Sequence, residues 1–325
     1  MTLIEAADFV ALGGLVALVA WRARPITEAV RWRNALLLQP ARPEDFSWIP
    51  PHFPADFKVE RRPPPQEFLD IVAGLRVGPD RSDWENALIL AAHLTEYVED
   101  KGPIQADLIT TYHAIRNGYG YCADFVRVFL ALAYTCELTA RQWAFSFDGF
   151  GGHGHTIVEV FDRGRKKWLL VDVLNNFHAV DASTGEPLGA LEYRDSLRGR
   201  RQAAIMRPNG PGRLGFVHAH KAIEYYQKGI PQWYLWWGNA VFSYDAHPLV
   251  RAMGAISRPL AQIAAIVAGV QPRIKIYETE ENAREVRRIF ALRRILLVVA
   301  GAAVVLAATL IFQLLADAGV ARAAR

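Results

Sequence analysis

The sequence predicts an α+β fold in which a helix packs on an antiparallel sheet, with transmembrane helices flanking this core. Residues 122–133 are apolar on most sides and have helix-forming composition, so they predict a helix buried in the middle of a domain. Residues 155–161 and 168–173 are β-rich runs around a polar turn that contains glycine, which indicates an antiparallel hairpin. Residues 295–315 carry no charge and are long enough to span a bilayer.

Length, net charge and cysteine content limit the classes of protein and partner that the sequence is compatible with. The chain has 325 residues, enough for one or two domains with a sizeable core. Its formal net charge of +4 is too small to indicate nucleic acid, and we expect no nucleic-acid partner. The two cysteines, Cys122 and Cys136, would lie about 21 Å apart on one continuous helix, too far to form a disulfide. We therefore expect Cys136 to be a buried structural thiol.

Residues 1–24 predict an N-terminal transmembrane helix. The apolar stretch is long enough to span a bilayer, although Glu5 and Asp8 interrupt it. A cleaved signal peptide is less favoured, because the start carries acidic residues where lysine or arginine is typical. A buried or interfacial helix is the alternative.

Residues 25–78 predict a proline-rich linker or strap. The prolines between positions 40 and 65 favour extended backbone. Aromatic residues among them indicate that the strap packs on the domain surface, where it could cover part of a cleft. These aromatic residues are Phe46, Trp48, Phe53 and Phe57.

Residues 79–200 predict the domain that holds the candidate site. Residues 84–98 have helical spacing, and Ser82 or Asp83 can cap this helix at its N-terminus. A second helix is expected over residues 105–116, directly before a turn that contains glycine.

This turn places Cys122 in the first turn of the next helix. Unpaired backbone N–H groups and the positive end of the helix dipole stabilise an anion there. A thiol at such a site has a lowered pKa and becomes a usable nucleophile. The alternative is that Cys122 is a small buried apolar residue.

The predicted hairpin presents a histidine and an aspartate to this cysteine. A turn centred near Gly164 and Arg165 places Ile157 opposite Asp172. His155 then lies two residues further along the same face as Asp172, at a diagonal Cα separation of about 7–8 Å that the two side chains can bridge. A slip of one residue would put them on opposite faces. A base oriented by a third group is the arrangement that activates a nucleophile.

These residues lie in three motifs that resemble the transglutaminase-like superfamily of papain-type cysteine enzymes. The family core reads G-x-C, H-x-W-x-E-V and W-x-x-x-D, and the resemblance covers about residues 80–180. The chain departs from this pattern at Ile157, where the family usually has tryptophan, and at Val173, where proline often follows the aspartate. The matching stretches are Gly120-Tyr-Cys122, His155-Thr-Ile-Val-Glu159-Val160 and Trp168-Leu-Leu-Val-Asp172.

The resemblance implies a papain-like core, no cofactor and no metal, and a peptide or protein substrate. Cys122 would attack an amide carbonyl, His155 would act as the base, and Asp172 would fix the imidazole tautomer. Hydrolysis of the resulting acyl-thioenzyme would make the protein a peptidase or amidase, which is the predicted function. Attack by an amine would instead make it a transamidase. An alternative of another class is a non-catalytic scaffold or binding module in a membrane assembly that handles cell-envelope polymers.

The roles of several histidines and acidic residues stay open. His153 competes with His155 for the role of base. The pairs His153/His155 and His218/His220 would suit a metal-dependent hydrolase, although neither pair brings a third ligand at recognisable spacing. Glu159 either supports the site by hydrogen bonding or points to solvent.

The orientation of the histidine and the oxyanion hole also allow alternatives. Asn175 or Asn176 would orient the imidazole if the hairpin register differs. The oxyanion hole would use the Cys122 backbone N–H and one polar side chain, and Asn117 and Tyr119 are near in sequence.

Residues 201–292 predict an accessory, aromatic-rich helical region. Residues 221–226 look helical. The aromatic cluster at 232–238 packs in a core, lines a substrate site or forms a membrane-interface belt. Residues 260–270 are too few to cross a bilayer, so they predict a packed or interfacial helix.

Residues 293–316 predict a C-terminal transmembrane helix, followed by a tail over 317–325. Five arginines fall between positions 284 and 294, whereas only Arg322 and Arg325 follow the apolar stretch, and arginines also follow the first apolar segment. Positive charge is typical of cytoplasmic flanks, so the pattern predicts an inner (cytoplasmic) membrane protein with a cytosolic catalytic domain, both termini outside, and membrane proteins as candidate partners. A reducing compartment suits an unpaired nucleophilic thiol.

Overall fold

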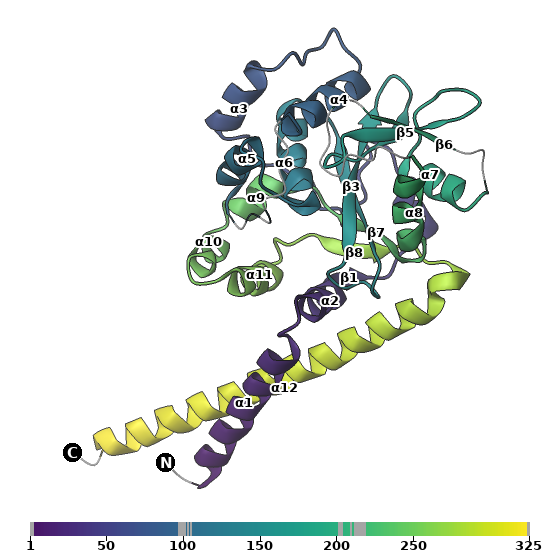
Figure 1. The fold of residues 1–325 in the computed structure, drawn as a ribbon. Helices are drawn as coiled ribbons and strands as arrows, with labels where there is room; N and C mark the ends of the chain where they lie inside the picture. The colour runs from purple at the N-terminus through teal and green to yellow at the C-terminus, as the bar shows by residue number, and fades with distance from the viewer. Residues whose placement is uncertain are drawn as a thin grey trace. The chain divides into compact units, whose positions relative to one another are not determined.

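The fold is α+β, as the sequence predicted. The chain divides into two compact units, which we call the helical unit and the sheet unit (Figure 1). The helical unit comprises Met1–Leu38, Asp148–His153 and Glu280–Arg325, and the sheet unit comprises Gln39–Phe147 and Gly154–Thr279. The computed structural model describes residues 3–96, 102, 104, 106–200, 204–208, 210 and 219–323.

The sheet unit is built around a six-stranded sheet with the order β1-β8-β7-β2-β3-β4. Strand β8 pairs with β7, β7 with β2, β2 with β3, and β3 with β4, each antiparallel. A separate antiparallel ribbon joins β5 to β6. The strands are β1 (Leu38–Gln39), β2 (Ala140–Ser146), β3 (Gly154–Asp162), β4 (Lys167–Val171), β5 (Phe177–Asp181), β6 (Ala204–Pro208), β7 (Trp233–Trp237) and β8 (Arg273–Ile276).

Four helices cover one face of this sheet, as Figure 1 shows to one side of β3. Helix α6 is buried along most of its length because its apolar side chains pack against the alternate residues Val158 and Val160 of β3. The sequence predicted this packing of an apolar helix on an antiparallel sheet. The four helices are α3 (Gln66–Ala73), α4 (Asp83–Leu94), α5 (Leu108–Arg116) and α6 (Cys122–Thr135).

The cap of α4 is Ser82, one of the two predicted alternatives. The Glu85 N–H donates to Ser82 Oγ at 3.2 Å, and the Ser82 N–H donates to Glu85 Oε2 at 2.8 Å, which forms a reciprocal capping box. Asp83 instead binds the Arg163 guanidinium beyond β3. The expected end of this helix at Val98 and the expected start of the next at Gln105 lie outside the described residues.

The opposite face of the sheet carries large aromatic side chains. Trp143 and Phe145 of β2 and Trp233 of β7 pack there, with Tyr226 covering them. Helices α7 (Ala190–Leu197) and α8 (Ala219–Gly229) lie on this side of β3 in Figure 1.

The proline-rich segment packs on this aromatic face, as predicted. The Trp48 ring lies 5.0 Å from the Trp168 ring of β4, and Trp168 Nε1 donates to the Trp48 carbonyl at 2.7 Å. Phe46, at the end of the short helix η1 (Pro43–Phe46), stacks on Trp143 at 5.5 Å. Residues 25–78 are not a simple linker, however, because the segment also contains two regular helices, α2 (Ile26–Leu37) and α3.

The aromatic run predicted to lie in an accessory helical region is instead strand β7. All five residues of β7 are buried, and β7 pairs with β2 on one side and with β8 on the other. Aromatic side chains suit a strand that is covered on both faces, which explains why the run shows no polar alternation. The remaining elements of this region are η2 (Ile230–Gln232), α9 (Val241–Asp245), α10 (Pro248–Gly254), α11 (Arg258–Val267) and η3 (Glu280–Asn282).

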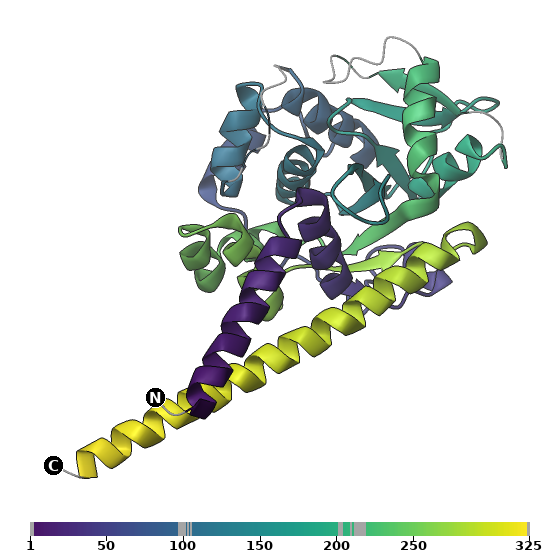
Figure 2. The same ribbon diagram turned by 60° about the horizontal axis from the view of Figure 1, so that its bottom comes forward.

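The helical unit consists of α1 (Leu3–Arg22), α2 (Ile26–Leu37) and α12 (Ala283–Ala323), with α12 contacting both of the others (Figure 2). Gln313 of α12 donates from Nε2 to Asp8 Oδ2 of α1 at 3.3 Å. The loop 148–153 is held to α2 by a hydrogen bond of 2.8 Å from Asn34 Nδ2 to the Phe150 carbonyl.

Residues Glu280–Ala316 form a helix long and apolar enough to cross a membrane. Its best window has a mean hydropathy of 2.9 and buries none of its residues within the protein. Among the described residues it is the one helix that meets both conditions, and the apolar part of α1, Ala6–Val19, is shorter.

Candidate active site

The hairpin register that the sequence predicted is confirmed. Phe161 pairs with Trp168 and Val158 pairs with Val171 across β3 and β4. Continuing this register places His155 at the start of β3 diagonally across from Asp172, which directly follows β4.

His155 and Asp172 form a buried hydrogen-bonded pair. His155 Nε2 lies 2.6 Å from Asp172 Oδ2, and the two residues are 3% and 0% exposed. Burial by itself would lower the pKa of His155, but the charge and hydrogen bond of Asp172 raise it to about 10. The imidazole is therefore stabilised in its protonated form.

Three further hydrogen bonds hold the Asp172 carboxylate. The Asn175 backbone N–H donates to Oδ1 at 3.1 Å, and Asn175 Nδ2 donates to Oδ2 at 2.8 Å. The Tyr226 hydroxyl also donates to Oδ2. Burial would raise the pKa of Asp172, but His155 and then these donors lower it below its ordinary value, so the carboxylate stays ionised.

Cys122 is the first residue of α6, as predicted. Gly120, two residues before it, has φ +107°, a conformation that side chains other than glycine rarely adopt. Within the described chain, the N–H groups of Cys122 and Ala123 donate to no acceptor, whereas the Tyr121 N–H donates to the Asp124 carboxylate at 2.9 Å. The start of α6 thus offers two open N–H donors beside the sulfur.

His155 lies close enough to Cys122 to shift the pKa of its thiol. Because Nε2 of the imidazole is bonded to Asp172, Nδ1 is the nitrogen that remains for the sulfur. Burial would raise the pKa of Cys122, but the hydrogen bond and charge of His155, with a smaller contribution from Thr156, lower it. The opposite shifts of the thiol and the imidazole favour a thiolate–imidazolium pair.

Two adjacent tyrosines of α8 complete the surroundings, and sequence reasoning did not assign them to the site. The Tyr225 ring lies 5.7 Å from the His155 ring in an edge-on arrangement, and the Tyr226 ring lies 6.0 Å from it. Burial, followed by the charges of Cys122 and Asp172, raises the pKa of Tyr225, so its hydroxyl stays protonated near the sulfur. The helical run over 221–226 was visible in the sequence, but no local pattern linked it to residues 54 positions away.

His153 is the other candidate for the base, and Asn175 and Asn176 are the other candidates for the group that orients it. His153 has a side chain 73% exposed and lies 3.3 Å from the Asp148 carboxylate within the helical unit. Asn175 orients Asp172 and not the imidazole. Asn176 is buried in a left-handed conformation at φ +50°.

Glu159 does not point to solvent. It is 2% exposed and accepts from Arg141 Nε at 2.7 Å, from Trp143 Nε1 at 2.6 Å and from the Ala190 N–H at 2.6 Å. These contacts tie β2 and β3 to the start of α7, so Glu159 has a structural role beside the site.

Among the residues that the structure describes, no group of three histidine, cysteine, aspartate or glutamate side chains is placed to hold a metal ion. His218, one member of the second histidine pair, lies outside the described residues.

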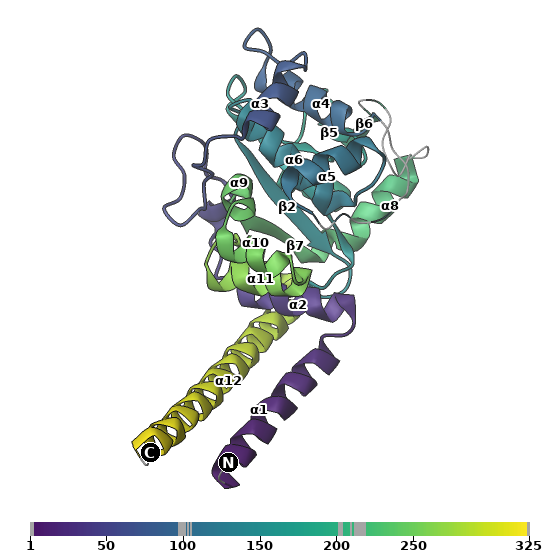
Figure 3. The same cartoon turned by 90° about the vertical axis from the view of Figure 1, so that its left-hand side faces the viewer.

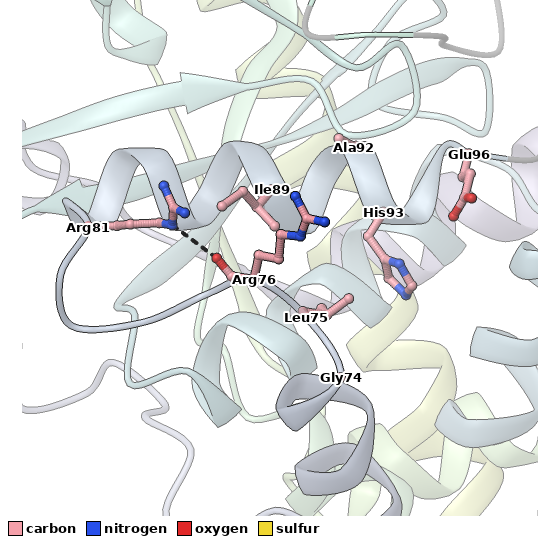
Figure 4. A pocket seen from close by; sticks show the side chains of 8 residues that line it. All are labelled: Gly74, Leu75, Arg76, Arg81, Ile89, Ala92, His93 and Glu96. Carbon is pink, nitrogen blue, oxygen red and sulfur yellow. Dashed lines mark hydrogen bonds between the residues drawn. The ribbon is translucent and has the colours of Figure 1, made fainter.

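A surface hollow of about 450 Å³ lies between α4 and the segment that joins α3 to it (Figure 4). Its lining combines apolar side chains with His93, Glu96 and two arginines, of which Arg81 donates from Nε to the Arg76 carbonyl at 3.0 Å. The lining contains none of Cys122, His155 and Asp172.

Comparison of the chain with protein-family models, with curated proteins and with solved structures found no match.

Proposed function

We propose that this protein is a membrane-anchored cysteine enzyme that hydrolyses a peptide or amide bond through an acyl-thioenzyme. The observation that carries the proposal is that Cys122, at the start of a helix, lies beside His155, which is itself hydrogen-bonded to the buried Asp172. A nucleophile, a base and a group that orients the base are the three parts that covalent acyl transfer needs.

In the first half of the reaction, Cys122 Sγ attacks the carbonyl carbon of the substrate and forms a carbon–sulfur bond. The carbonyl oxygen becomes an oxyanion, which the open N–H groups of Cys122 and Ala123 can stabilise. The imidazolium of His155 then donates its proton to the amine nitrogen as the carbon–nitrogen bond breaks. The products are the free amine and an acyl-thioenzyme.

In the second half, a water molecule attacks the thioester carbonyl while His155 takes its proton. The carbon–sulfur bond breaks, the carboxylic acid leaves, and the thiolate–imidazolium pair is restored. An amine in place of water would give a transamidase from the same intermediate. Asp172 keeps the imidazole aligned throughout and stabilises its positive charge.

The arrangement of elements also supports a papain-like, transglutaminase-like core. A buried helix begins with the cysteine and packs on an antiparallel hairpin that carries the histidine and the aspartate, in the chain order that the motif resemblance implies. The lowered pKa of Cys122 beside His155 favours an enzyme over a non-catalytic scaffold, because a scaffold needs no activated thiol.

The anchor is α12, with α1 packed along it. Arginines gather before the apolar part of α12 and after that of α1, so the positive-inside rule places the sheet unit in the cytosol and both termini on the other side. The bond between Asp8 and Gln313 supports this pairing, because it satisfies two polar side chains near the ends of the apolar stretches.

Labelling in membranes with a thiol-reactive amide probe tests the enzymatic assignment. We expect mass spectrometry to locate the probe on Cys122, and we expect labelling to fall in the His155→Ala variant. Cys136 is the internal control, because burial raises the pKa of its thiol to about 11. Equal labelling of the two cysteines, or labelling of Cys122 that is independent of His155, would contradict the proposal.

A further inference from the structure

Helices α10 and α11 expose an unusual amount of apolar surface in the sheet unit. On α11, Leu260, Ile263 and Val267 are 39%, 57% and 78% exposed and recur at helical spacing, so they form one stripe. Ile256, in the turn between the two helices, is 68% exposed, and Leu249 at the start of α10 is 42% exposed. We call these five residues the apolar stripe.

The face of α11 that carries Leu260, Ile263 and Val267 is not the face that packs in the protein. Ala261 and Ala265 occupy the other side, where they are buried against Val250 of α10. Figure 3 shows α10 and α11 side by side. The helix is therefore apolar on two sides, and its small alanines, not its large side chains, make the intramolecular contact. Three large apolar side chains exposed on one face of α11, with two more exposed on the adjoining helix and turn, indicate an interaction site.

The charged residues on and around α10 and α11 indicate which kind of partner the apolar stripe binds. Residues 246–277 contain no aspartate or glutamate, and Arg251 and Arg258 lie on the two helices, whereas Lys275 of β8 is buried and paired with Asp45. Arg251 is exposed on α10, two positions after Leu249 of the apolar stripe. Apolar side chains combined with basic residues and no acidic ones are typical of a helix that lies in the interface of an anionic bilayer.

We propose that α10 and α11 dock on the anionic lipid surface, with the apolar stripe inserted at the border between headgroups and acyl chains. The proposal rests on the membrane anchor of the proposed function, since α12 brings the chain to a bilayer. The ten residues of α11 are too few to cross that bilayer, so α11 lies in its surface. A second copy of the chain is a poorer occupant, because two such surfaces would bring like charges together.

The test uses the full chain reconstituted in vesicles, with an environment-sensitive fluorophore on a single cysteine in a Cys122→Ser, Cys136→Ser background. Ile263→Cys reports the apolar stripe. Leu69→Cys is the matched control, because Leu69 is an apolar residue 42% exposed on α3, outside the stripe. Val298→Cys reports the anchor itself. Lipids that carry a quencher just below the headgroup measure contact with the membrane.

We expect the label at Ile263 to be quenched several-fold more strongly than the label at Leu69, with blue-shifted emission and a larger effect in anionic than in zwitterionic vesicles. Adding Arg251→Gln to the Ile263→Cys protein should reduce the preference for anionic lipid. Ile263 and Leu69 are both exposed, so replacing either one with a labelled cysteine removes no core contact.

Equal, weak quenching at Ile263 and Leu69 beside strong quenching at Val298 would overturn the docking while leaving the anchor intact. A blue shift at Ile263 that grows with protein density and resists the lipid quencher would assign the stripe to a second copy, and would also overturn it. Weak quenching at Val298 would count against the anchor, and strong quenching at Ile263 would then still establish the docking.

Discussion

Two buried ion pairs lie on the same face of strand β3, four positions apart, and they differ in what surrounds them. Glu159 pairs with Arg141, and His155 pairs with Asp172. Both pairs are almost completely removed from solvent. The first lies in the middle of the sheet, and the second lies where β3 begins and α6 starts.

The pair of Arg141 and Glu159 is enclosed by fixed partners. The Arg141 guanidinium lies 4.1 Å from the Trp168 ring and donates from Nη2 to the Phe46 carbonyl at 3.0 Å, while Glu159 accepts from Trp143 as well. None of these groups offers a site for a substrate. The pair therefore holds the strap and β2 together.

In the pair of His155 and Asp172, only one of the two imidazole nitrogens is bonded to the carboxylate. Asp172 is enclosed by Asn175 and Tyr226, but His155 also lies beside Cys122 and lowers the pKa of its thiol, and Cys122 is half-buried. Burial and pairing therefore do not distinguish the two ion pairs, whereas the Cys122 thiol beside His155 does.

The largest expected effect comes from removing the nucleophile. We expect Cys122→Ala to abolish acyl-enzyme formation, with a loss of at least roughly 10³-fold in turnover, because no other group in the site can form the thioester. The unfolding temperature should stay close to that of the unsubstituted protein, since the change removes one half-buried sulfur. Activity that survives in the purified variant would remove Cys122 from the mechanism.

Removing one partner of the Arg141–Glu159 pair should lower the stability of the fold, in contrast to Cys122→Ala. Glu159→Ala leaves the Arg141 charge buried without its partner, so we expect a loss of about 3–5 kcal/mol in the free energy of unfolding, measured by denaturant titration in detergent. The double variant Arg141→Met, Glu159→Leu should recover much of this loss, because it removes both charges together. A Glu159→Ala protein as stable as its parent would show that the pair does not hold the sheet.

Asp172→Asn removes the negative charge of the side chain and keeps its shape. The thiolate–imidazolium pair requires a pH above the pKa of Cys122 and below that of His155, which predicts a bell-shaped dependence of turnover on pH. Loss of the Asp172 charge should lower the pKa of His155 toward its ordinary value, so the alkaline limb should move to lower pH. Turnover should fall by roughly 10²–10⁴-fold. An alkaline limb that does not move would mean that Asp172 does not set the imidazole charge.

Tyr226→Phe is expected to have the smallest effect. It removes one donor to Asp172 and keeps the ring that packs on Phe145, so we expect a loss of about 1.5 kcal/mol, or roughly tenfold in kcat, with little change in KM. Tyr112→Phe is the matched control, because it removes a hydroxyl that contacts His93 instead. Equal effects of the two substitutions on kcat would indicate a general loss of packing and not positioning of Asp172.

Part of the site could be predicted because it depends on local rules. A glycine-containing turn followed by an apolar run places Cys122 at a helix start, and the turn near Gly164 sets the register that pairs His155 with Asp172. Both rules operate over fewer than about twenty residues, where turn geometry and strand alternation decide which way a side chain points.

Strand β7 and the partner of Glu159 depend on contacts between distant segments. The run over 232–238 is apolar on both faces, so its period does not distinguish a buried strand from a packed aromatic cluster. Its place between β2 and β8 is decided by the sheet. The partner of Glu159 could not be read locally either, because Arg141 lies on a neighbouring strand.

The sequence by itself determined the α+β class, the helix that begins at Cys122, the hairpin register and the apolar stretch of α12, since each follows from the order of side chains along a short segment. Only the tertiary structure decided that Tyr226 holds Asp172, that Glu159 is buried against Arg141, and that α11 turns its alanines inward and its large side chains outward. The physical reason is that these contacts depend on the chain path between segments, which packing of the whole core selects and no local pattern encodes.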